Sequence, residues 1–495
     1  MKNKFRTGFV HFSKVISPAM LATILVGIIC GIILFIPPIN GLADSGDFYN
    51  TLLSNGLYRF STHYNQYNDF VIKKFGILQY YNENHFYTVS SQMIFVRLAV
   101  FLNKLFYSKT VFDIRFMGLV NSSFYLGGIY LLTKSLVTPI RKIKNYIIAL
   151  LVVLIFGDAA YILFFNSFYS EAQMLIFTVY LFAAIMSLAR NIYQRHWPMI
   201  GVFFLNAILL VTTKPASASL TISLILISIG LLFLPDFKAR RMAIIFGSLL
   251  IFMAGTGIYL SASPETRDAN NFESFAHGVL LDNSDPTTQV EKGGINGQFA
   301  LSRGDNYYIG SYTAIKPSGK YVRKNLLRKN GIGWVTRYYL GNPKQLFQLL
   351  NVAASNITSI QPANIGNYPR GSGHKALSRY KYFMIYSSMV RFFYPGKYAF
   401  DCLMALSATM CYAVGGYLDI KGHRYHGILR FFLVLGLMVA VVYIPIYTIV
   451  TAGASDLAQR LFMVGTSLNL TFLLFITDIL NHTLWHTDGK VGDDD

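Results

Sequence analysis

Charged residues are scarce in this sequence. Only 13% of its 495 residues are Asp, Glu, Lys or Arg, whereas 53% are hydrophobic. Soluble globular proteins carry about 25% charged residues, so this composition excludes them and indicates a polytopic membrane protein. Acidic residues are scarcer still, with 23 against 43 basic ones, and the formal net charge is +20. Because the basic residues gather mainly in short loops between apolar runs, this charge does not indicate a nucleic-acid partner.

Cysteine is almost absent as well. The three cysteines, Cys30, Cys402 and Cys411, all lie within apolar runs. This placement excludes a disulfide framework and a cysteine-based metal centre, and it predicts thiols that pack as small hydrophobic groups. A small-residue cleavage site is also lacking after the first apolar run. We therefore expect a retained first span rather than a signal peptide.

Apolar runs long enough to cross a bilayer are abundant. They lie at about 17–38, 113–137, 144–160, 172–189, 197–213, 217–234, 242–260, 397–418, 427–450 and 461–480. These runs predict an α-helical polytopic membrane protein with about ten transmembrane helices.

Basic residues mark alternate short loops. Lys134, Arg190, Lys238 and Arg424 lie in loops on one side, whereas the opposite loops carry only the isolated Lys214 and Arg460. The positive-inside rule then predicts a plasma-membrane protein with both termini on the cytoplasmic side. The polar segments 39–112 and 261–396 fall outside. We predict a membrane module over 1–260 with about seven spans, an extracytoplasmic mixed loop domain over 261–396, and a module over 397–495 with about three spans and a short tail.

Two polar segments contain helical patterns. Residues 91–106 carry apolar side chains every three to four positions with Arg97 and Lys104 between them, which predicts an amphipathic helix. This helix either lies in the membrane interface or packs on the protein. Residues 332–350 show the same spacing of aromatic and apolar side chains within the second outer segment.

Ionisable residues are nearly missing from the middle of the runs, which weighs against an ion-coupled transporter. They gather instead where the runs meet the outer face, at Asp44, Asp47, Asp158, Glu171, Lys214, Asp456 and Arg460. Each also has a purely structural explanation. Asp44 or Asp47 could cap a helix that begins at Phe48, Asp158 and Glu171 could end or start spans, and the cations could anchor at lipid headgroups.

Several segments resemble a known enzyme group. The many spans, the acidic first outer loop and the large late outer loop resemble the GT-C superfamily of glycosyltransferases, which use polyprenyl-phosphate-linked sugars. More narrowly, the bacterial glycan biosynthesis hexose transferase family is similar in five segments, namely 41–48 (GLADSGDF), 165–171 (FNSFYSE), 275–280 (FAHGVL), 391–396 (RFFYPG) and 455–462 (SDLAQRLF). The chain departs from that family where Ser170 and Ala172 flank Glu171 in place of Gly and Pro.

The resemblance implies an inverting hexosyltransferase with its active site on the extracytoplasmic face. The donor would be an undecaprenyl-phosphate-linked sugar, and the acceptor a cell-wall glycopolymer such as a teichoic acid, mainly in Gram-positive bacteria. In this mechanism one carboxylate acts as general base on the acceptor hydroxyl, and cations stabilise the leaving phosphate.

The resemblance also implies roles for individual residues. Asp44 is the first choice for the base, Asp47 the second, and Glu171 completes the catalytic set. Arg460, Lys214 and Arg370 would bind the donor phosphate. Contacts to acceptor or sugar would come from Asp158, Asn166, Tyr169, His277 and Asp456. No cofactor is required, and a divalent cation, Mg²⁺ or Mn²⁺, stays open.

Two other functions compete with this one. A glycolipid flippase in the same pathway would need a polar path through the spans, and the sequence offers few charges there. A non-catalytic membrane scaffold would leave the clustering of Asp44, Asp47, Glu171 and Arg460 at one face without a purpose.

Overall fold

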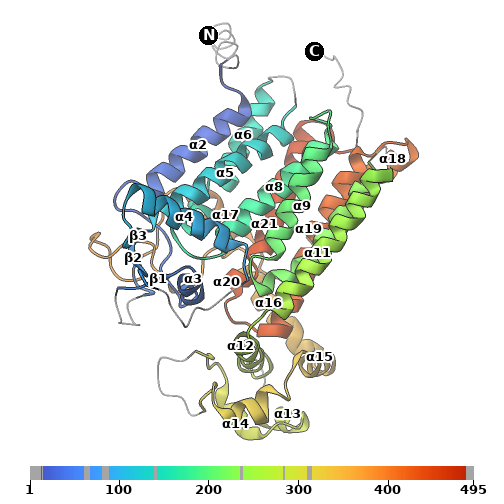
Figure 1. Cartoon of the computed structure of the whole chain (residues 1–495). Coiled ribbons are helices and arrows are strands. Elements are labelled where there is room, and N and C mark those ends of the chain that lie inside the picture. The colour runs from blue at the N-terminus through green and yellow to red at the C-terminus, as the bar shows by residue number, and fades with distance from the viewer. Residues whose placement is uncertain are drawn as a thin grey trace.

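The computed structural model describes residues 13, 15–60, 67–80, 89–138, 142–234, 238–281, 285–308 and 315–485. The described chain is mostly helical, with one bundle of long apolar helices and a set of shorter helices beyond one end of it (Figure 1). The bundle consists of α2 (Pro18–Leu34), α5 (Arg115–Leu136), α6 (Ile143–Phe156), α8 (Glu171–Ala189), α9 (Trp197–Val211), α10 (Thr221–Leu231), α11 (Lys238–Leu260), α18 (Tyr398–Lys421), α19 (His426–Ala452) and α21 (Phe462–Leu480).

Six of these helices are long and apolar enough to cross a membrane, namely α5, α8, α11, α18, α19 and α21. A seventh crossing is possible if α6 counts as one span with α7 (Ala159–Ile162) and the 3-10 helix η2 (Leu163–Asn166), which follow it after a 51° bend. Three shorter apolar helices are α2, α9, and α10 together with η3 (Pro215–Leu220). Each predicted apolar run thus contains an apolar helix, and the chain is a multi-pass membrane protein embedded in a lipid bilayer. The count of about ten spans stays a prediction.

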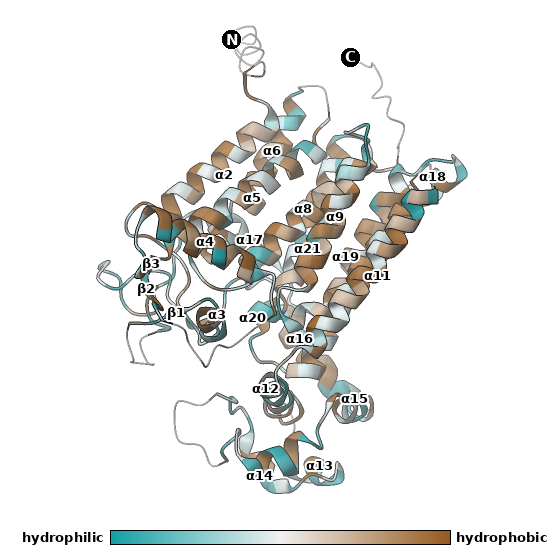
Figure 2. Cartoon of the chain, in the orientation of Figure 1, coloured by the Kyte–Doolittle hydropathy of each residue, from teal (hydrophilic) through white to brown (hydrophobic). Residues whose placement is uncertain are grey.

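Burial separates the centre of the bundle from its rim. Within its most apolar stretch, α8 is 94% buried, whereas α11 and α18 are only 28% buried. α8 packs on α5, α9, α19 and α21, which explains why its apolar residues run all round the helix. The exposed side of α11 is strongly apolar, as expected of a surface that faces lipid, and includes Met242, Ile245, Phe246, Leu249, Phe252 and Met253. Figure 2 shows the same contrast, with apolar bundle helices and more polar segments around α12 and α14.

Helix ends that are far apart in the sequence meet at one end of the bundle. The Tyr146 hydroxyl donates to the carbonyl of Ile16 at 2.7 Å, and Asn481 donates to the carbonyl of Leu136 at 3.0 Å. Arg190 also lies at this end and pairs with Asp478 at 2.9 Å. Arg430 and Tyr412 approach the other oxygen of Asp478, each at 3.1 Å. The basic loops predicted to be cytoplasmic therefore share one end of the molecule.

The first outer segment holds an unpredicted three-stranded sheet. β1 (Leu57–Tyr58) and β3 (Val111–Asp113) flank the central β2 (Lys74–Ile77), and all pairs are antiparallel. Leu57 pairs with Ile77, and Phe75 pairs with Phe112. A side chain at Gly76 would collide with the Tyr58 ring, whose nearest atom would lie 2.1 Å from the added Cβ. α3 (Phe48–Ser54) precedes β1 and begins at the predicted residue.

The amphipathic helix α4 (Gln92–Phe106) packs on the protein, which is one of its two predicted placements, and its position in the membrane interface stays a prediction. One face packs on α5 and buries Phe95, Val96, Ala99 and Val100. The opposite face leaves Ile94, Phe101, Leu105 and Phe106 more than half exposed. An apolar face outside the protein core suits the membrane interface.

Helices also fill the second outer segment. They are α12 (Pro264–Ser274), η4 (Phe275–Val279), α13 (Pro286–Lys292), η5 (Gly297–Ser302), α14 (Lys320–Val322), η6 (Arg323–Leu327), α15 (Ile332–Gly341), α16 (Pro343–Asn356) and α17 (Ile385–Phe393). The predicted helical pattern over 332–350 is confirmed by α15 and α16, which Asn342 separates. In the described part of this segment the only β contact is a bridge between Pro369 and Val71, and the mixed loop domain stays a prediction. The module boundaries stay predictions.

Candidate functional site

The loop after α2 is held between two distant segments. Asn166 donates to the carbonyls of Leu34 at 3.0 Å and Asn40 at 2.9 Å. Asn367 donates to the carbonyl of Gly41 at 3.1 Å and accepts from its amide at 3.2 Å through its own carbonyl. A Cβ at Gly41 would lie 2.5 Å from the Asn166 carbonyl oxygen, so only glycine fits this approach. Asn166, predicted to bind sugar, is buried and acts here as a brace for the loop.

Asp44 is enclosed at the start of α3. Its side chain is fully buried, and Oδ1 accepts hydrogen bonds from the amides of Gly46 at 2.7 Å and Phe48 at 3.2 Å. Oδ2 pairs with the Arg59 guanidinium, which lies 4.2 Å from the centre of the Tyr67 ring. Both oxygens of Asp44 are therefore occupied by the protein, and this carboxylate rather than Asp47 supplies the predicted helix-capping contact.

Asp47, in contrast, is exposed. Its Oδ2 accepts from the Ser45 hydroxyl at 2.7 Å and from Gln459 Nε2 at 2.8 Å. Gln459 belongs to α20 (Leu457–Arg460), the short helix that precedes α21. From the residues that the structure describes, Oδ1 of Asp47 receives no hydrogen bond. Asp47 thus has a fixed position and one oxygen that faces away from its protein partners.

Tyr169 fixes the turn between these two carboxylates. Its hydroxyl donates to the Ala43 carbonyl at 3.0 Å, accepts from the Ser45 amide at 3.0 Å and lies 2.9 Å from the Ser45 hydroxyl. Burial raises the pKa of Tyr169 far above its ordinary value, and the negative charge of Asp47 raises it further. Tyr169, predicted to contact sugar, remains a neutral hydrogen-bonding group that positions Ser45.

Asp456 lies opposite Asp47, at the start of α20. Its backbone is left-handed, with a φ of 47°, and its carboxylate makes no capping bond to α20. Part of the residue is exposed, yet the surrounding protein desolvates its carboxyl group and raises the pKa, and the charge of Asp47 raises it further. Three basic side chains oppose this effect, namely Arg460, Lys214 and, when protonated, His277. Most of the predicted residues are therefore within electrostatic reach of one another.

Two cations of this group have defined partners. Lys214 Nζ lies 2.5 Å from Oε1 of Glu171, the first residue of α8, and the Lys214 side chain is 25% exposed. Arg460 donates to Asn270 Oδ1 on α12 at 3.0 Å. The Nε of Arg460 is buried and lacks a hydrogen-bond partner among the described residues. Arg460 thus retains a donor for a further group, whereas the charge of Lys214 is balanced by Glu171.

The second outer segment contributes two further residues to this group, Glu273 and His277. Glu273 of α12 lies 3.4 Å from His277 Nε2 and accepts from the Tyr307 amide at 2.7 Å. Burial raises the pKa of Glu273, while the Tyr307 hydrogen bond and the cations His277 and Arg460 lower it. The His277 carbonyl accepts from the Ala454 amide at 2.8 Å, which joins η4 to the turn before α20. We refer to Asp47, Glu171, Lys214, Glu273, His277, Asp456 and Arg460 as the polar cluster.

Two predicted site residues have other surroundings. Asp158 caps α7 by accepting from Ala160 at 2.9 Å, and it accepts from the amide and the hydroxyl of Ser387, both at 2.9 Å. Asp158 therefore lies just after α6 and caps the start of α7, which gives it a structural role, while its sugar-binding role stays a prediction. Arg370 is exposed on the loop after Pro369, beside the bridge to Val71.

The sequence analysis missed four contributors to this region, namely Arg59, Asn270, Glu273 and Gln459. Gln459 lies three positions after Asp456 and one before Arg460, so helical spacing within 455–462 could have identified it. Glu273 lies four positions before His277, so the same spacing could have identified it too, whereas Arg59 and Asn270 are defined by contacts across the fold and have no local signal.

The described residues contain no group of three or more His, Cys, Asp or Glu side chains that could hold a metal ion. The acidic residues of the polar cluster alternate with Lys214, His277 and Arg460, which compete for the same oxygens. Binding of a divalent cation therefore stays a prediction.

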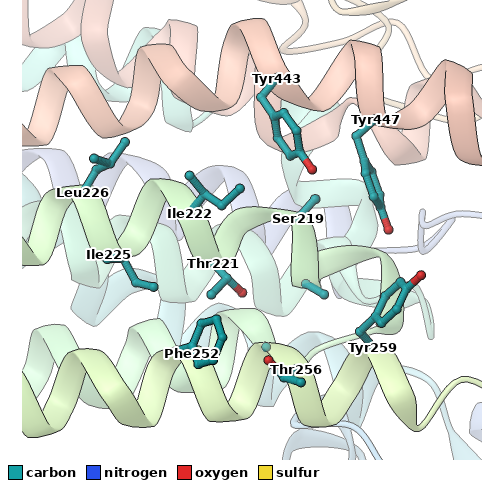
Figure 3. Close-up of a pocket in the computed structure, with 12 residues that line it drawn as sticks. Ser219, Thr221, Ile222, Ile225, Leu226, Phe252, Thr256, Tyr259, Tyr443 and Tyr447 are labelled. Atoms are coloured by element: carbon teal, nitrogen blue, oxygen red, sulfur yellow. The ribbon is translucent and has the colours of Figure 1, made fainter. Parts of the chain in front are cut away.

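An apolar groove lies among the helices of the bundle (Figure 3). It has a volume of about 510 Å³ and lies between η3 and α10, α11 and α19. Leucine, isoleucine and phenylalanine line one part of it, including Ile222, Leu226 and Phe252, while Tyr259, Tyr443 and Tyr447 lie toward the other part. Tyr447 is within electrostatic reach of Arg460, so the tyrosine end of the groove approaches the cluster.

Comparison with known proteins identified one family. The searches of curated proteins and of solved structures each returned no match. A family model described as YfdI N-terminal transmembrane domain matches residues 2–494. Because this match covers nearly the whole chain, the protein belongs to the YfdI N-terminal transmembrane domain family.

Proposed function

We propose that this protein is a membrane glycosyltransferase that transfers a hexose from a polyprenyl-phosphate-linked donor to an extracytoplasmic cell-wall glycopolymer. The observation that carries the proposal is the exposed carboxylate of Asp47, which Ser45 and Gln459 hold beside cations at one end of the bundle. The family match and the resemblance of the motifs support the same reaction class.

Asp47 fits the role of general base better than Asp44 does. A base must reach the acceptor hydroxyl within hydrogen-bonding distance, and Oδ1 of Asp47 is available for that contact. Asp44 is fully buried, and its oxygens already bind Arg59 and two backbone amides. In our proposal Asp44 and Arg59 therefore shape the turn that presents Asp47.

The reaction follows from these positions. The acceptor oxygen bonds to the anomeric carbon while the bond from that carbon to the phosphate oxygen breaks. The electron pair of the broken bond stays on the phosphate, and the hydroxyl proton passes to Asp47. Arg460, whose buried Nε has no partner among the described residues, stabilises the charge that develops on the phosphate. Inversion results because the base and the leaving group lie on opposite faces of the sugar.

The apolar groove supports a lipid-linked donor. Its leucine, isoleucine and phenylalanine lining suits a hydrocarbon chain, and its tyrosine end lies toward Arg460. A donor chain in this groove would bring its phosphate to the cluster and leave the sugar beside Asp47.

The test is transfer from undecaprenyl-phosphate hexose by purified protein in nanodiscs. We expect Asp47→Asn to lower kcat by about 10²–10⁴-fold, the usual contribution of a general base. The control variant Asp305→Asn removes a carboxylate of the second outer segment that lies outside the polar cluster. Full activity of Asp47→Asn at normal protein levels would contradict the assignment.

The flippase alternative is tested in cells of the Asp47→Asn strain. Accumulation of carrier-linked sugar in the outer leaflet indicates that transfer is blocked after translocation. Accumulation in the inner leaflet indicates that translocation itself is lost and supports the flippase.

A further inference from the structure

A second cavity lies on the other side of α20. Its volume is about 490 Å³, and it is lined mainly by two segments, 356–363 and 379–391. Among its lining residues are three cations, Arg379, Lys381 and Arg391, but neither Asp nor Glu belongs to the described lining. We call this cavity the basic pocket. The polar cluster, in contrast, contains more carboxylates than cations.

Two cations of the basic pocket lie close together without a carboxylate partner in its described lining. Arg379 is half-buried, and burial together with the positive charge of Arg391 lowers its pKa. Arg379 donates to Gln361 Oε1 at 3.0 Å and to the Pro362 carbonyl, and both acceptors are neutral. The arrangement therefore leaves net positive charge that an anion would neutralise.

Gln361 independently indicates a ligand-binding site. Its side chain is only 9% exposed and lines the basic pocket. Because the Arg379 guanidinium has only donors, it fixes the amide with Oε1 toward itself and Nε2 away. Nε2 is buried and finds no acceptor in the described part of the chain. A buried amide donor without a partner beside two arginines indicates a site for an anionic acceptor of hydrogen bonds.

The basic pocket adjoins the proposed base through α20. Ala458 lines the pocket, and the next residue, Gln459, donates to Asp47. Arg379 is also within electrostatic reach of Tyr169, whose hydroxyl holds Ser45. A ligand in the pocket would therefore lie beside the carboxylate that we propose as general base.

The lining distinguishes this pocket from the apolar groove. Polar side chains, including Asn356, Thr358, Ser359 and Ser388, accompany the three cations. Such a surface suits a hydrated, hydroxyl-bearing anion rather than a hydrocarbon chain. The groove beside Arg460 already offers a place for the donor lipid, so the basic pocket is left for the other substrate.

We propose that the basic pocket binds a phosphate group of the acceptor, so that the acceptor is a phosphate-bearing glycopolymer rather than a neutral glycan. This inference rests on the proposed function, because it names the acceptor of that reaction. Arg379, Lys381, Arg391 and the Gln361 amide hold the phosphate. The neighbouring hydroxyl of the same repeat unit then reaches Asp47.

The helix that carries Arg391, α17, indicates where the protein would bind such a polymer. α17 leaves Ile385, Met389, Phe392 and Phe393 more than half exposed, while Ser387, Ser388 and Arg391 line the pocket. An exposed apolar face opposite a polar one is typical of a helix at the membrane interface. The basic pocket is thus placed at the membrane surface.

Binding to the full-length protein in nanodiscs of zwitterionic lipid tests the proposal. The probes are synthetic tri(glycerol phosphate), uncharged tri(glycerol) and inorganic phosphate. We expect the charged trimer to bind at least about tenfold more tightly than the neutral one, and to bind more weakly as salt is added. Equal affinity for both trimers overturns the proposal, and so does binding of inorganic phosphate alone, which would mark an adventitious ion only.

Variants locate the binding. Arg391→Gln and Lys381→Gln, both at exposed positions, should each weaken the charged trimer about tenfold, whereas the control Arg303→Gln should not. In transfer assays the pocket variants should raise KM for the acceptor without changing KM for the donor. Competition by undecaprenyl phosphate for the trimer site, with a raised donor KM in Arg391→Gln, would assign the pocket to the donor and overturn the proposal.

These outcomes separate the two proposals. Trimer binding that depends on Arg391 in a protein that transfers no sugar would leave the pocket standing and reject the glycosyltransferase. Sugar transfer with an acceptor KM that is unchanged in Arg379→Gln, Lys381→Gln and Arg391→Gln would reject the pocket and leave the glycosyltransferase standing.

Discussion

Gln459 Nε2 donates a 2.8 Å hydrogen bond to Oδ2 of Asp47, which lies 412 positions earlier in the chain. This bond connects the first outer loop to the short helix before the last span. It also orients the carboxylate through Oδ2, while Oδ1 receives no hydrogen bond from the residues that the structure describes. The contact is therefore a direct link between the end of the chain and the proposed base.

Replacing Gln459 tests this link. We expect Gln459→Ala to lower kcat about tenfold, because Asp47 loses one of the two groups that orient it, while thermal stability stays within about 0.5 kcal/mol. Transfer kinetics and unfolding in the same nanodiscs measure both quantities. Gln348→Ala, on the exposed side of α16, is the matched control. A stability loss that accounts for the whole activity loss would contradict a positioning role.

Asp44 is expected to matter for stability. Asp44→Asn removes the negative charge that pairs with the largely buried Arg59, whose side chain is 12% exposed. Removing one member of a buried ion pair costs about 3–5 kcal/mol. The free energy of unfolding measures this loss. Arg323→Gln breaks a pair in which Arg323 is 51% exposed and should cost less than about 1 kcal/mol. Similar losses of unfolding free energy in both variants would show that the buried Asp44–Arg59 pair stabilises the protein no more than an exposed pair does.

Gly41 is expected to tolerate no side chain. In Gly41→Ala the new Cβ would lie 2.5 Å from the Asn166 carbonyl oxygen, so the loop or η2 must shift, at a cost of about 1–3 kcal/mol. Gly31→Ala is the control, because a Cβ there meets nothing within 4 Å, and helix propensity predicts a gain of about 0.5–1 kcal/mol. Thermal unfolding distinguishes the two variants. A neutral Gly41→Ala would mean that the loop is not held by Asn166.

Glu273 is expected to make stability depend on pH. Its pKa is raised in the folded protein, chiefly by burial, above the ordinary value of about 4.3. Its stabilising contribution is therefore complete below that value and is lost as the pH rises through the raised pKa. Gln cannot ionise, so Glu273→Gln should gain stability relative to the wild type as the pH rises from that ordinary value toward neutral pH. Unfolding curves across that range test this, and parallel profiles for the two proteins would contradict it.

Much of the fold was predictable because hydrophobic runs are local. Every predicted run contains an apolar helix, and α4 and α15 follow the spacing of their apolar residues. The sheet was not predictable, since β1 to β3 are only two to four residues long. Alternation over so few residues carries no usable signal.

The candidate site was predictable in its membership but not in its roles. Asp44 and Asp47 are three residues apart and look equivalent in the sequence. Their partners in the fold distinguish them. Arg59 pairs with Asp44 inside the protein, whereas Gln459 holds Asp47 at the surface. Such long-range partners depend on the folded chain. Asp158 was ambiguous for the same reason, since its partner Ser387 lies 229 positions away.

The enclosure of α8 has a consequence for biosynthesis. α8 is 94% buried, yet two of its neighbours, α19 and α21, belong to the last part of the chain. His426 contacts Ala189 across 237 positions. At about 5–20 residues per second, the ribosome needs roughly 10–50 s to supply that stretch. During this interval α19 and α21 have not yet been made. The side of α8 that they will cover, on a helix whose first residue is Glu171, therefore contacts lipid, the translocon or an insertion chaperone. A nascent chain arrested before α19 should therefore be a preferred target of membrane quality-control proteases.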